Sequence, residues 1–311
     1  MKILLTGCLG QLGQELRHRL LSHGRLYATD HNTPADNHQI FSLDLTDRGA
    51  LLRILDKLQP DLIINTAAWT AVDAAETEQE PANAINVAVP QLLAEWAAAN
   101  QALLFHYSTD YVFDGSNTKP WCEDDSVGPV SVYGQSKLDG ENAVINSGCK
   151  HIIIRTSWVY SSHSKNFVRT MLQLAANRDQ LQVVDDQRGC PTLAENVAAV
   201  TVEILKQLQV KEEQNLSGVY HYTDDQPLAW CEFAERIFSR AHEIGLIEGI
   251  PEVIAVDSSV FQTPAKRPLY SVLNCEKIER TFGIRQKSFS HALDGCLADI
   301  QRNHSETTTK T

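Results

Sequence analysis

The sequence predicts an α/β protein in which a doubly wound parallel sheet is joined by a smaller, interleaved α/β lobe. Over residues 1–160, short apolar strand patterns alternate with amphipathic helix patterns, as in parallel sheets with crossover helices. A glycine-rich turn separates the first strand pattern from the first helix pattern. Over residues 161–311 the strands become short and proline-containing segments interrupt them. We expect mainly a second lobe there, with some segments returning to the first domain.

The glycine turn has the spacing Gly-x-x-Gly-x-x-Gly, with Gly7, Gly10 and Gly13 between a strand at 3–6 and a helix at 12–21. In such a unit, glycines let the backbone approach a pyrophosphate, and the helix N-terminus favours its negative charge. The commoner spacing is Gly-x-Gly-x-x-Gly, and a glycine turn without a cofactor is the alternative. The context predicts a Rossmann-type NAD(P)-binding domain over residues 1–160.

A second strand pattern at 26–30 ends in Asp30, at the distance from the glycine turn that is typical of a ribose-binding carboxylate. A carboxylate there binds the adenosine ribose hydroxyls and repels a 2′-phosphate, which favours NADH. Arg17 and Arg25 partly offset this charge, so the sequence leaves NADPH open.

Further patterns predict the rest of the sheet. The strand at 40–45 carries Asp44, which is either a contact beside the adenine or a turn residue. The strand at 61–68 is apolar, as expected when both faces are covered, and it ends in small residues where a backbone can approach a cofactor. An alanine-rich helix at 81–99 has Pro90 in its first turn or at a kink. Two more strands are expected at 102–107 and 152–155.

The second half mixes helices and short strands too irregularly for a simple continuation of the sheet. We expect helices at 165–177, 193–207, 229–242 and 288–302. We expect short strands near 181–184, 218–222 and 252–256. These elements would form a substrate-binding lobe.

Tyr133 is the only one of the eight tyrosines with a lysine four residues later, Lys137. In a helix this spacing places both side chains on one face. An ammonium beside a phenol stabilises the phenolate, so we expect Lys137 to lower the pKa of Tyr133 from about 10 and to poise it for acid/base work. Ser108 and Thr109 could hydrogen-bond the carbonyl oxygen of a substrate that Tyr133 protonates. An ordinary helix surface is the alternative.

The composition limits the class of protein. With 43% hydrophobic and 21% charged residues, the chain is that of a soluble globular protein. A formal charge of −12 and the lack of a Lys/Arg run argue against nucleic acid and anionic membranes as partners. Seven scattered cysteines without a Cys-x-x-Cys pair suit reduced thiols. With no signal peptide and no membrane-spanning run, we expect a cytoplasmic protein.

Together these stretches resemble the extended short-chain dehydrogenase/reductases and, within that superfamily, the dTDP-4-dehydrorhamnose reductase family. The resemblance covers nearly the whole chain. The glycine turn and the Tyr-x-x-x-Lys pair are shared by the superfamily, whereas other segments are particular to the rhamnose enzymes. Those segments are 106–113, 155–160, 166–171, 186–192, 267–268 and 273–274.

The resemblance implies reduction of the C4 ketone of a dTDP-linked 6-deoxy-4-ketosugar by NADH or NADPH. Tyr133 would protonate the forming alkoxide, Lys137 would hold the nicotinamide ribose, and Thr109 would complete the triad. Asp110 and Trp158 would contact the sugar, with plain core as the alternative for Trp158. The residues implied to contact the cofactor are Gly7, Gly10, Gln11, Leu12, Gly13, Asp30, Asp44, Leu45, Ala68, Trp69, Thr70, Tyr107, Tyr133 and Lys137.

A dTDP-sugar carries a diphosphate, which requires local cations in an acidic protein. Arg188 and Arg267 are the candidates, each in an irregular, proline-containing loop. A surface arginine held in an ion pair is the alternative. Asn166 either caps the following helix or reaches a phosphate.

Some family members bind Mg²⁺ through carboxylates at a dimer interface. The matching residues here are Glu15, Glu195 and Asp299. A hard cation suits these ligands, but the aspartate shortens the third one. Solvated acids on helix surfaces are the alternative, so the sequence leaves both Mg²⁺ and a homodimer open.

Three residues depart from what the family leads us to expect. Cys8 and Cys190 lie in loops beside the cofactor and the substrate, either as inert thiols or as sites sensitive to thiol reagents. Trp69 stands where we expect a histidine, and its bulk would alter the cofactor side of the pocket.

Two alternatives to this function stay open. One is a reductase or epimerase of another nucleotide-linked 4-ketosugar, because a few polar contacts decide sugar identity. The other is a non-catalytic NAD(P)-binding regulatory subunit. The complete set of Thr109, Tyr133 and Lys137 argues against the regulatory subunit.

Overall fold

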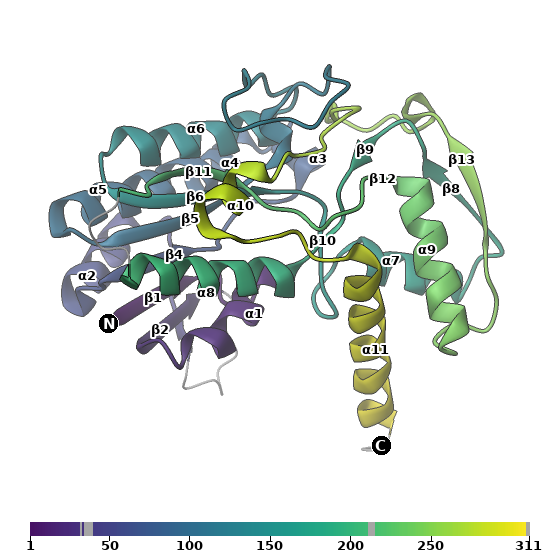
Figure 1. Ribbon diagram of the computed structural model, residues 1–311, viewed down its shortest axis with the longest axis horizontal. Helices are drawn as coiled ribbons and strands as arrows, with labels where there is room; N and C mark the ends of the chain where they lie inside the picture. Colours follow the sequence, from purple (N-terminus) through teal and green to yellow (C-terminus); the bar gives the residue numbers. More distant parts are fainter. Residues whose placement is uncertain (32, 34–39, 211–214, 309–311) are drawn as a thin grey trace.

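The computed structural model describes residues 1–308 apart from 32, 34–39 and 211–214 (Figure 1). In these residues, seven parallel strands form one sheet in the order β3-β2-β1-β4-β5-β6-β11. The strands are β1 (Lys2–Thr6), β2 (Arg25–Asp30), β3 (Ile40–Ser42), β4 (Leu62–Asn65), β5 (Leu103–Thr109), β6 (Lys150–Thr156) and β11 (Gly218–His221). The strand order reverses between β1 and β4, and ligands bind at the carboxyl ends of strands beside such a reversal.

Helices cover both faces of this sheet. One face carries α1 (Gln11–Leu20), α8 (Ala194–Val210) and α10 (Glu276–Phe282), and the other carries α2 (Arg48–Leu58), α5 (Val89–Asn100) and α6 (Val132–Asn146). Every residue of β4 is buried, as its apolar sequence predicts for a strand between two helical layers. The predicted doubly wound parallel sheet is confirmed.

The segment before α5 is not the single helix at 81–99 that the sequence predicted. Between β4 and β5 the chain forms α3 (Val72–Ala75), α4 (Gln79–Asn83), a π-helix at Ala84–Ala88 and then α5. Pro90 lies in the first turn of α5, where its missing N–H costs little. The π-helix places the buried Asn86 toward the sheet's ligand-binding edge, and π-helical turns are frequent at functional sites.

The second lobe has its own apolar core. Its elements are β7 (Val159–Tyr160), α7 (Phe167–Ala175), β8 (Gln180–Val184), β9 (Arg188–Gly189), β10 (Thr192–Leu193), β12 (Leu228–Ala229), α9 (Trp230–Glu243), β13 (Glu252–Val256) and α11 (Phe289–Thr308). Fully buried Tyr160, Phe233 and Phe238 lie at the centre of this core, together with the inner face of α11. In Figure 1 this lobe stands beside the sheet, and α11 extends away from it.

The two lobes are interleaved along the chain. β11 is the seventh strand of the large sheet and pairs with β6, although it comes from the second half of the sequence. Val197 of α8 and Phe282 of α10 belong to the same core as Leu5 of β1. The sequence predicted a strand at 218–222 but not its place in the large sheet. The domain boundary at residue 160 stays a prediction.

The helices expected after residue 160 occur as α7, α8, α9 and α11, each within a few residues of its predicted bounds except at the longer C-terminal end of α11. α10 was not predicted. Across the described part of the chain, no helix combines the length and the apolar character needed to span a membrane.

Candidate active site

The space around the glycine turn fits a dinucleotide pyrophosphate. Gly7 has a φ of +67°, and a Cβ at Gly13 would lie 2.1 Å from the carbonyl oxygen of Gly7. Gly10 precedes α1 in an extended conformation, and no side chain of the described residues caps the helix there. The first N–H groups of α1 therefore have no side-chain acceptor, which is the arrangement that binds phosphate at a helix N-terminus.

Asp30 ends β2 beside this turn. Its Oδ2 accepts a hydrogen bond of 3.0 Å from the backbone N–H of Leu9, and its Oδ1 accepts one of 2.9 Å from the N–H of His31. The carboxylate therefore shapes the glycine turn and also places a negative charge at the strand end where an adenosine ribose binds in such domains.

Asp44 lies in the turn after β3. Its Oδ1 accepts hydrogen bonds from the hydroxyl and the backbone N–H of Thr46, at 2.6 and 2.9 Å. These bonds lower the pKa of the Asp44 carboxyl. The residue is exposed while Leu45 is buried, so the structure places Asp44 as a turn residue at the rim of the cofactor edge.

Gln11 joins the cofactor turn to the second lobe. Its Oε1 accepts a hydrogen bond of 2.8 Å from the hydroxyl of Ser161, and its Nε2 donates one of 3.3 Å to the carbonyl of Val159. The neighbouring Leu12 packs on the core of the sheet. The cofactor contacts of Gln11 and Leu12 stay a prediction, and in the structure the Gln11 side chain holds the two lobes together.

The segment after β4, with Ala68, Trp69 and Thr70, is held by a residue that the sequence did not indicate. Asn86 accepts a hydrogen bond from the N–H of Trp69 and donates to its carbonyl, at 2.9 and 3.1 Å. Asn86 also donates to the hydroxyl of Ser136 on α6, at 3.0 Å. The half-buried indole of Trp69 donates to the carbonyl of Ala71 within its own loop.

β5 and α6 bring Thr109, Tyr133 and Lys137 together. Ser131 caps α6 by accepting a hydrogen bond of 3.1 Å from the N–H of Gly134, and Tyr133 and Lys137 then lie one turn apart. The Thr109 hydroxyl at the end of β5 hydrogen-bonds the phenol of Tyr133. The buried Lys137 Nζ donates a hydrogen bond of 2.6 Å to the carbonyl of Tyr107.

The pKa of Tyr133 shifts opposite to the sequence-based expectation. Burial is the main cause and, with a smaller effect of Asp110, raises the pKa to about 12 against the opposing effect of the bond with Thr109. Burial also lowers the pKa of Lys137 to about 8, against the opposing effect of Glu141. The expectation was wrong because desolvation of the phenolate outweighs the nearby ammonium, whose proton is directed at the Tyr107 carbonyl.

Tyr107 contributes its backbone to this site. Its phenol shares a hydrogen bond of 2.8 Å with Thr201 of α8, on the opposite face of the sheet from α6. The cofactor contact of Tyr107 stays a prediction, and in the structure its carbonyl accepts the hydrogen bond from Lys137.

Asp110 is a buried acid directly beside the triad. Its Oδ1 accepts a hydrogen bond of 3.0 Å from the hydroxyl of Thr109, whereas its Oδ2 has no partner within the described residues. Burial raises the pKa of Asp110 from 3.8 to about 7, an effect partly offset by the hydroxyls of Ser271 and Thr109. Near neutral pH the group is therefore poised to donate or accept a hydrogen bond.

The raised pKa of Asp110 predicts a pH dependence of stability. Between about pH 4 and pH 7 the native carboxyl keeps its proton and the unfolded one loses it, so the free energy of unfolding falls as the pH rises. Asp110→Asn should make this slope shallower in urea unfolding measured at several pH values. An unchanged slope would mean that Asp110 does not titrate in this window.

Arg267 is held by a carboxylate that the sequence did not indicate. Its guanidinium donates a hydrogen bond of 2.7 Å to Asp73 of α3 and one of 2.8 Å to the hydroxyl of Thr263. It also hydrogen-bonds the phenol of Tyr111, whose ring meets that of Tyr133 edge-on at 5.9 Å. Arg267 thus lies near Tyr133, and in the structure it forms the ion pair that the sequence analysis gave as its alternative role.

Arg188 and Asn166 lie on the second lobe. Arg188 is half-exposed in β9, with Glu232 at 3.5 Å as its ion-pair partner. Asn166 caps α7 by accepting a hydrogen bond of 3.2 Å from Arg169, and its amide donates to the carbonyl of Ser161 at 2.8 Å. Both ends of the Asn166 amide are thus used around the helix cap, the first of the two roles that the sequence left open.

Trp158 follows β6 at the same edge of the sheet. Thr109 pairs with Thr156 in register, so Trp158 emerges two residues beyond the neighbour of Thr109. Its φ is +47°, a left-handed conformation that large side chains rarely adopt. Strained backbone of this kind clusters at functional sites.

The three predicted metal ligands do not form a metal site in the described chain. Arg19 donates to Glu15 at 2.8 Å and to Glu195 at 2.7 Å, and Asp299 is paired with Arg302. Among the described residues, no group of three or more acidic, histidine or cysteine side chains is arranged to hold a metal ion. Because the predicted site lies at an interface between two chains, it stays a prediction, and within one chain these carboxylates are paired with arginines.

Cys8 and Cys190 are inert by position. They are 0% and 1% exposed, and burial raises the pKa of each thiol to about 12. A thiol that is both inaccessible and protonated reacts poorly with electrophiles. The structure thus favours the first of the two roles left open.

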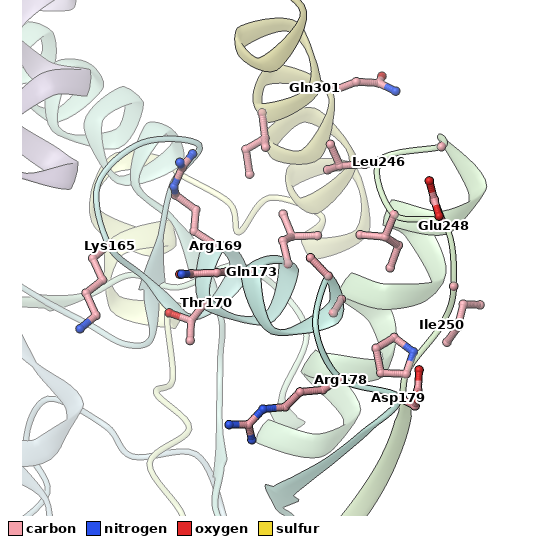
Figure 2. A pocket seen from close by; sticks show the side chains of 18 of the residues that line it. Lys165, Arg169, Thr170, Gln173, Arg178, Asp179, Leu246, Glu248, Ile250 and Gln301 are labelled. Carbon is pink, nitrogen blue, oxygen red and sulfur yellow. The ribbon is translucent and has the colours of Figure 1, made fainter. Parts of the chain in front are cut away.

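One large cavity lies in the second lobe, away from the strand ends. It measures about 1550 Å³ and lies among α7, the segment 245–251 and α11 (Figure 2). Lys165, Arg169 and Arg178 line it, but none of the predicted catalytic, cofactor or sugar residues does. We therefore place the active site at the carboxyl edge of the sheet.

Comparisons with known proteins agree with this geometry. The family model described as RmlD substrate binding domain matches residues 1–302. A dTDP-4-dehydrorhamnose reductase from Aggregatibacter actinomycetemcomitans is 40% identical over 299 residues, which cover 96% of this chain and 98% of the relative.

Two solved structures have the same fold along their whole length. A dTDP-4-dehydrorhamnose reductase from Clostridium acetobutylicum has a TM-score of 0.86 and 35% identity, covering 97% of this chain and 100% of its own. The enzyme of that name from Bacillus anthracis, solved in complex with NADP, has a TM-score of 0.82 and 31% identity, covering 96% and 99%.

Proposed function

Because the chain belongs to the RmlD substrate binding domain family, we propose that it is a dTDP-4-dehydrorhamnose reductase. The reaction is the reduction of the C4 ketone of dTDP-4-dehydro-L-rhamnose to dTDP-L-rhamnose, with NADH or NADPH as reductant. The observation that carries the proposal is the assembly of Thr109, Tyr133 and Lys137 beside a glycine turn that fits a dinucleotide.

The chemistry divides between the cofactor and the chain. With its pyrophosphate held at the glycine turn, a reduced nicotinamide dinucleotide would supply the hydride for C4. Tyr133 gives its phenolic proton to the carbonyl oxygen as the alcohol forms, and Thr109 hydrogen-bonds the same oxygen. Lys137 provides a positive charge beside the phenolate that Tyr133 becomes.

The raised pKa of Tyr133 suits this direction of reaction. With a pKa near 12, Tyr133 is a phenol throughout the neutral range and always carries the proton to be given. An alkoxide is a stronger base than a phenolate, so the transfer is downhill once the hydride has arrived. The tyrosine acts as the acid, and bulk solvent afterwards restores its proton.

We further propose that Asp110 and Trp158 contact the sugar and that Arg188 faces the diphosphate. The unpartnered Oδ2 of Asp110 supports a contact with a sugar hydroxyl or the ketone. The half-exposed Arg188 has one ion pair at 3.5 Å, which a diphosphate can replace at little cost.

Turnover tests the proposal. Purified protein with NADPH, and separately with NADH, should oxidise the cofactor when dTDP-4-dehydro-L-rhamnose is added, followed by absorbance. Oxidation with a different nucleotide-linked 4-ketosugar alone would favour the alternative substrate. Cofactor binding without turnover of any ketosugar would favour the regulatory subunit.

The choice of cofactor depends on Asp30. Asp30→Asn removes the negative charge while keeping an acceptor for the N–H of Leu9, so the glycine turn stays intact. We expect this variant to lower the ratio of kcat/KM for NADH to that for NADPH by about tenfold, an electrostatic effect of about 1.4 kcal/mol. Asp44→Asn, at the exposed turn, is the matched control. An unchanged ratio in Asp30→Asn would place Asp30 away from the ribose.

We infer that a metal is not required for turnover. The arginine pairs of Glu15, Glu195 and Asp299 support this inference. Treatment with EDTA should leave kcat and KM unchanged, and a loss restored by Mg²⁺ would contradict it. Light scattering with and without Mg²⁺ tests the homodimer that the resemblance implies.

We propose that the enzyme works in the cytoplasm. All seven cysteines are free, and six of them are buried. Free thiols suit a reducing compartment, which is also where reduced nicotinamide is kept. A fusion to a fluorescent protein, fractionated with cytoplasmic and membrane markers, tests the location.

A further inference from the structure

Trp158 is fixed in a backbone conformation that it would rarely adopt by itself. Its φ of +47° lies in the left-handed region, which disfavours a large aromatic side chain. The carbonyl of Trp158 accepts a hydrogen bond of 3.3 Å from the N–H of Thr192. The preceding Ser157 donates one of 2.7 Å to the carbonyl of Cys190. The segment 190–192 therefore holds the backbone on both sides of this strained residue.

The indole of Trp158 is fixed as well. It stacks on the indole of Trp230, with ring centroids 3.5 Å apart and an angle of 8° between the planes. Its edge lies over Gly189, where a Cβ would come within 2.5 Å of the Trp158 ring. Rings this close have almost no lateral offset, an arrangement less favoured than offset stacking, so the surroundings impose it.

Trp230 belongs to the rigid part of the second lobe. It is the first residue of α9, and its ring also packs against Phe167 of α7, with centroids 4.7 Å apart. Phe167 in turn stacks on the fully buried Phe233. The position of the Trp230 ring is therefore set by the lobe's core.

The fixed indole lies at the catalytic edge. Strand β9, which contains Gly189, connects the indole to the surroundings of Asp110. The carbonyl of Arg188 in β9 accepts a hydrogen bond of 2.8 Å from the N–H of Ser271. Ser271 lies near Asp110, and its hydroxyl lowers the pKa of the Asp110 carboxyl. Trp158 and Asp110 thus border one region beside Tyr133.

We propose that Trp230 is a positioning residue that holds Trp158 in place against the sugar, with Gly189 supplying the space for the indole edge. This inference rests on the proposed function, because it takes Trp158 as a sugar contact. Trp230 does not touch the reacting atoms. It acts by keeping the Trp158 ring in a fixed orientation before the substrate binds, so that no ordering of the ring is needed at that moment.

The test compares variants of Trp230 with a control in the same core. Trp230→Leu removes the stack, and we expect KM for dTDP-4-dehydro-L-rhamnose to rise by about 3- to 10-fold, with the dissociation constant for NADPH unchanged. Trp230→Phe, which keeps a ring, should recover part of this loss. Phe167→Leu disturbs the same cluster but leaves the stack of the two indoles in place, so it should lower the melting temperature and raise KM far less than Trp230→Leu does.

Gly189→Ala is a second variant that changes the contact at the edge of the Trp158 indole. It leaves α9 unaltered, so its effect does not arise from a loss of helix stability. The added methyl displaces the Trp158 ring, so KM for the ketosugar should rise as it does in Trp230→Leu. If both variants turn over with the wild-type KM, the positioning role is refuted. If Phe167→Leu raises KM as much as Trp230→Leu, the effect is general loosening of the lobe and the proposal also fails. A wild-type protein that never reduces the ketosugar would instead refute the proposed function.

Discussion

Replacing Tyr133 with phenylalanine is expected to lower kcat by about 10²- to 10⁴-fold, while the dissociation constant for NADPH stays unchanged. The substitution removes a single hydroxyl, the group that hydrogen-bonds Thr109 and carries the proton. The ring remains to pack edge-on against Tyr111, so the pocket keeps its shape. Steady-state turnover and cofactor titration by fluorescence measure the two quantities separately.

Tyr111→Phe is the matched control for this prediction. Tyr111 lies in the same pocket and also hydrogen-bonds through its phenol, but its partner is Arg267. We expect its effect on kcat to be far smaller than that of Tyr133→Phe. Equal losses in the two variants, or full activity in Tyr133→Phe, would remove Tyr133 from the role of proton donor.

Replacing Arg155 with leucine is expected to destabilise the fold by about 3–5 kcal/mol, because it leaves a buried carboxylate without its partner. Arg155 on β6 and Glu141 on α6 are 4% and 1% exposed. The guanidinium donates to both carboxylate oxygens, at 2.9 Å and 2.6 Å, and also lies over the ring of Phe113. Urea unfolding followed by circular dichroism measures the loss.

A double variant separates the ion pair from the packing of its side chains. Glu141→Leu together with Arg155→Leu leaves no unpaired charge, so it should recover a large part of the stability lost in Arg155→Leu alone. The pair lies one turn beyond Lys137, whose pKa Glu141 raises, so the single variant also changes the charge next to the catalytic lysine. If the double variant loses as much stability as the two single variants together, the unpaired charge is not the cause.

The local features of the fold could be predicted from the sequence. The glycine turn, the strand that ends in Asp30 and the Tyr133–Lys137 pair each depend on residues close together in the chain. Apolar runs covered by helices on both faces identify strands such as β4 without any knowledge of distant contacts. These are the parts of the structure that the sequence-based predictions placed correctly.

Features that depend on distant contacts could not be predicted. The pairing of Arg267 with Asp73 joins residues far apart in the chain, and it decides that this arginine is already neutralised. Asn86 lies in a helical pattern, and only the π-helix directs it to Trp69. The pKa of Tyr133 depends on how deeply α6 is packed, which the spacing of two residues does not reveal.

Trp230 shows the same limit. Nothing in its local sequence distinguishes it from a core tryptophan, because its relation to the site passes through Trp158 and Gly189, which come from other elements. The left-handed backbone of Trp158 is equally invisible in the sequence, since tryptophan gives no preference for it.

The most direct measurement of the central claim is transfer of deuterium from NADPH that carries deuterium at both positions of the nicotinamide C4. The protein is incubated with labelled cofactor and dTDP-4-dehydro-L-rhamnose, and the sugar product is examined by NMR and mass spectrometry. The account predicts dTDP-L-rhamnose with one deuterium at C4 of the sugar, formed by the wild type and scarcely by Tyr133→Phe. Unlabelled product, label at another carbon, or unchanged ketosugar in the presence of bound cofactor would contradict it.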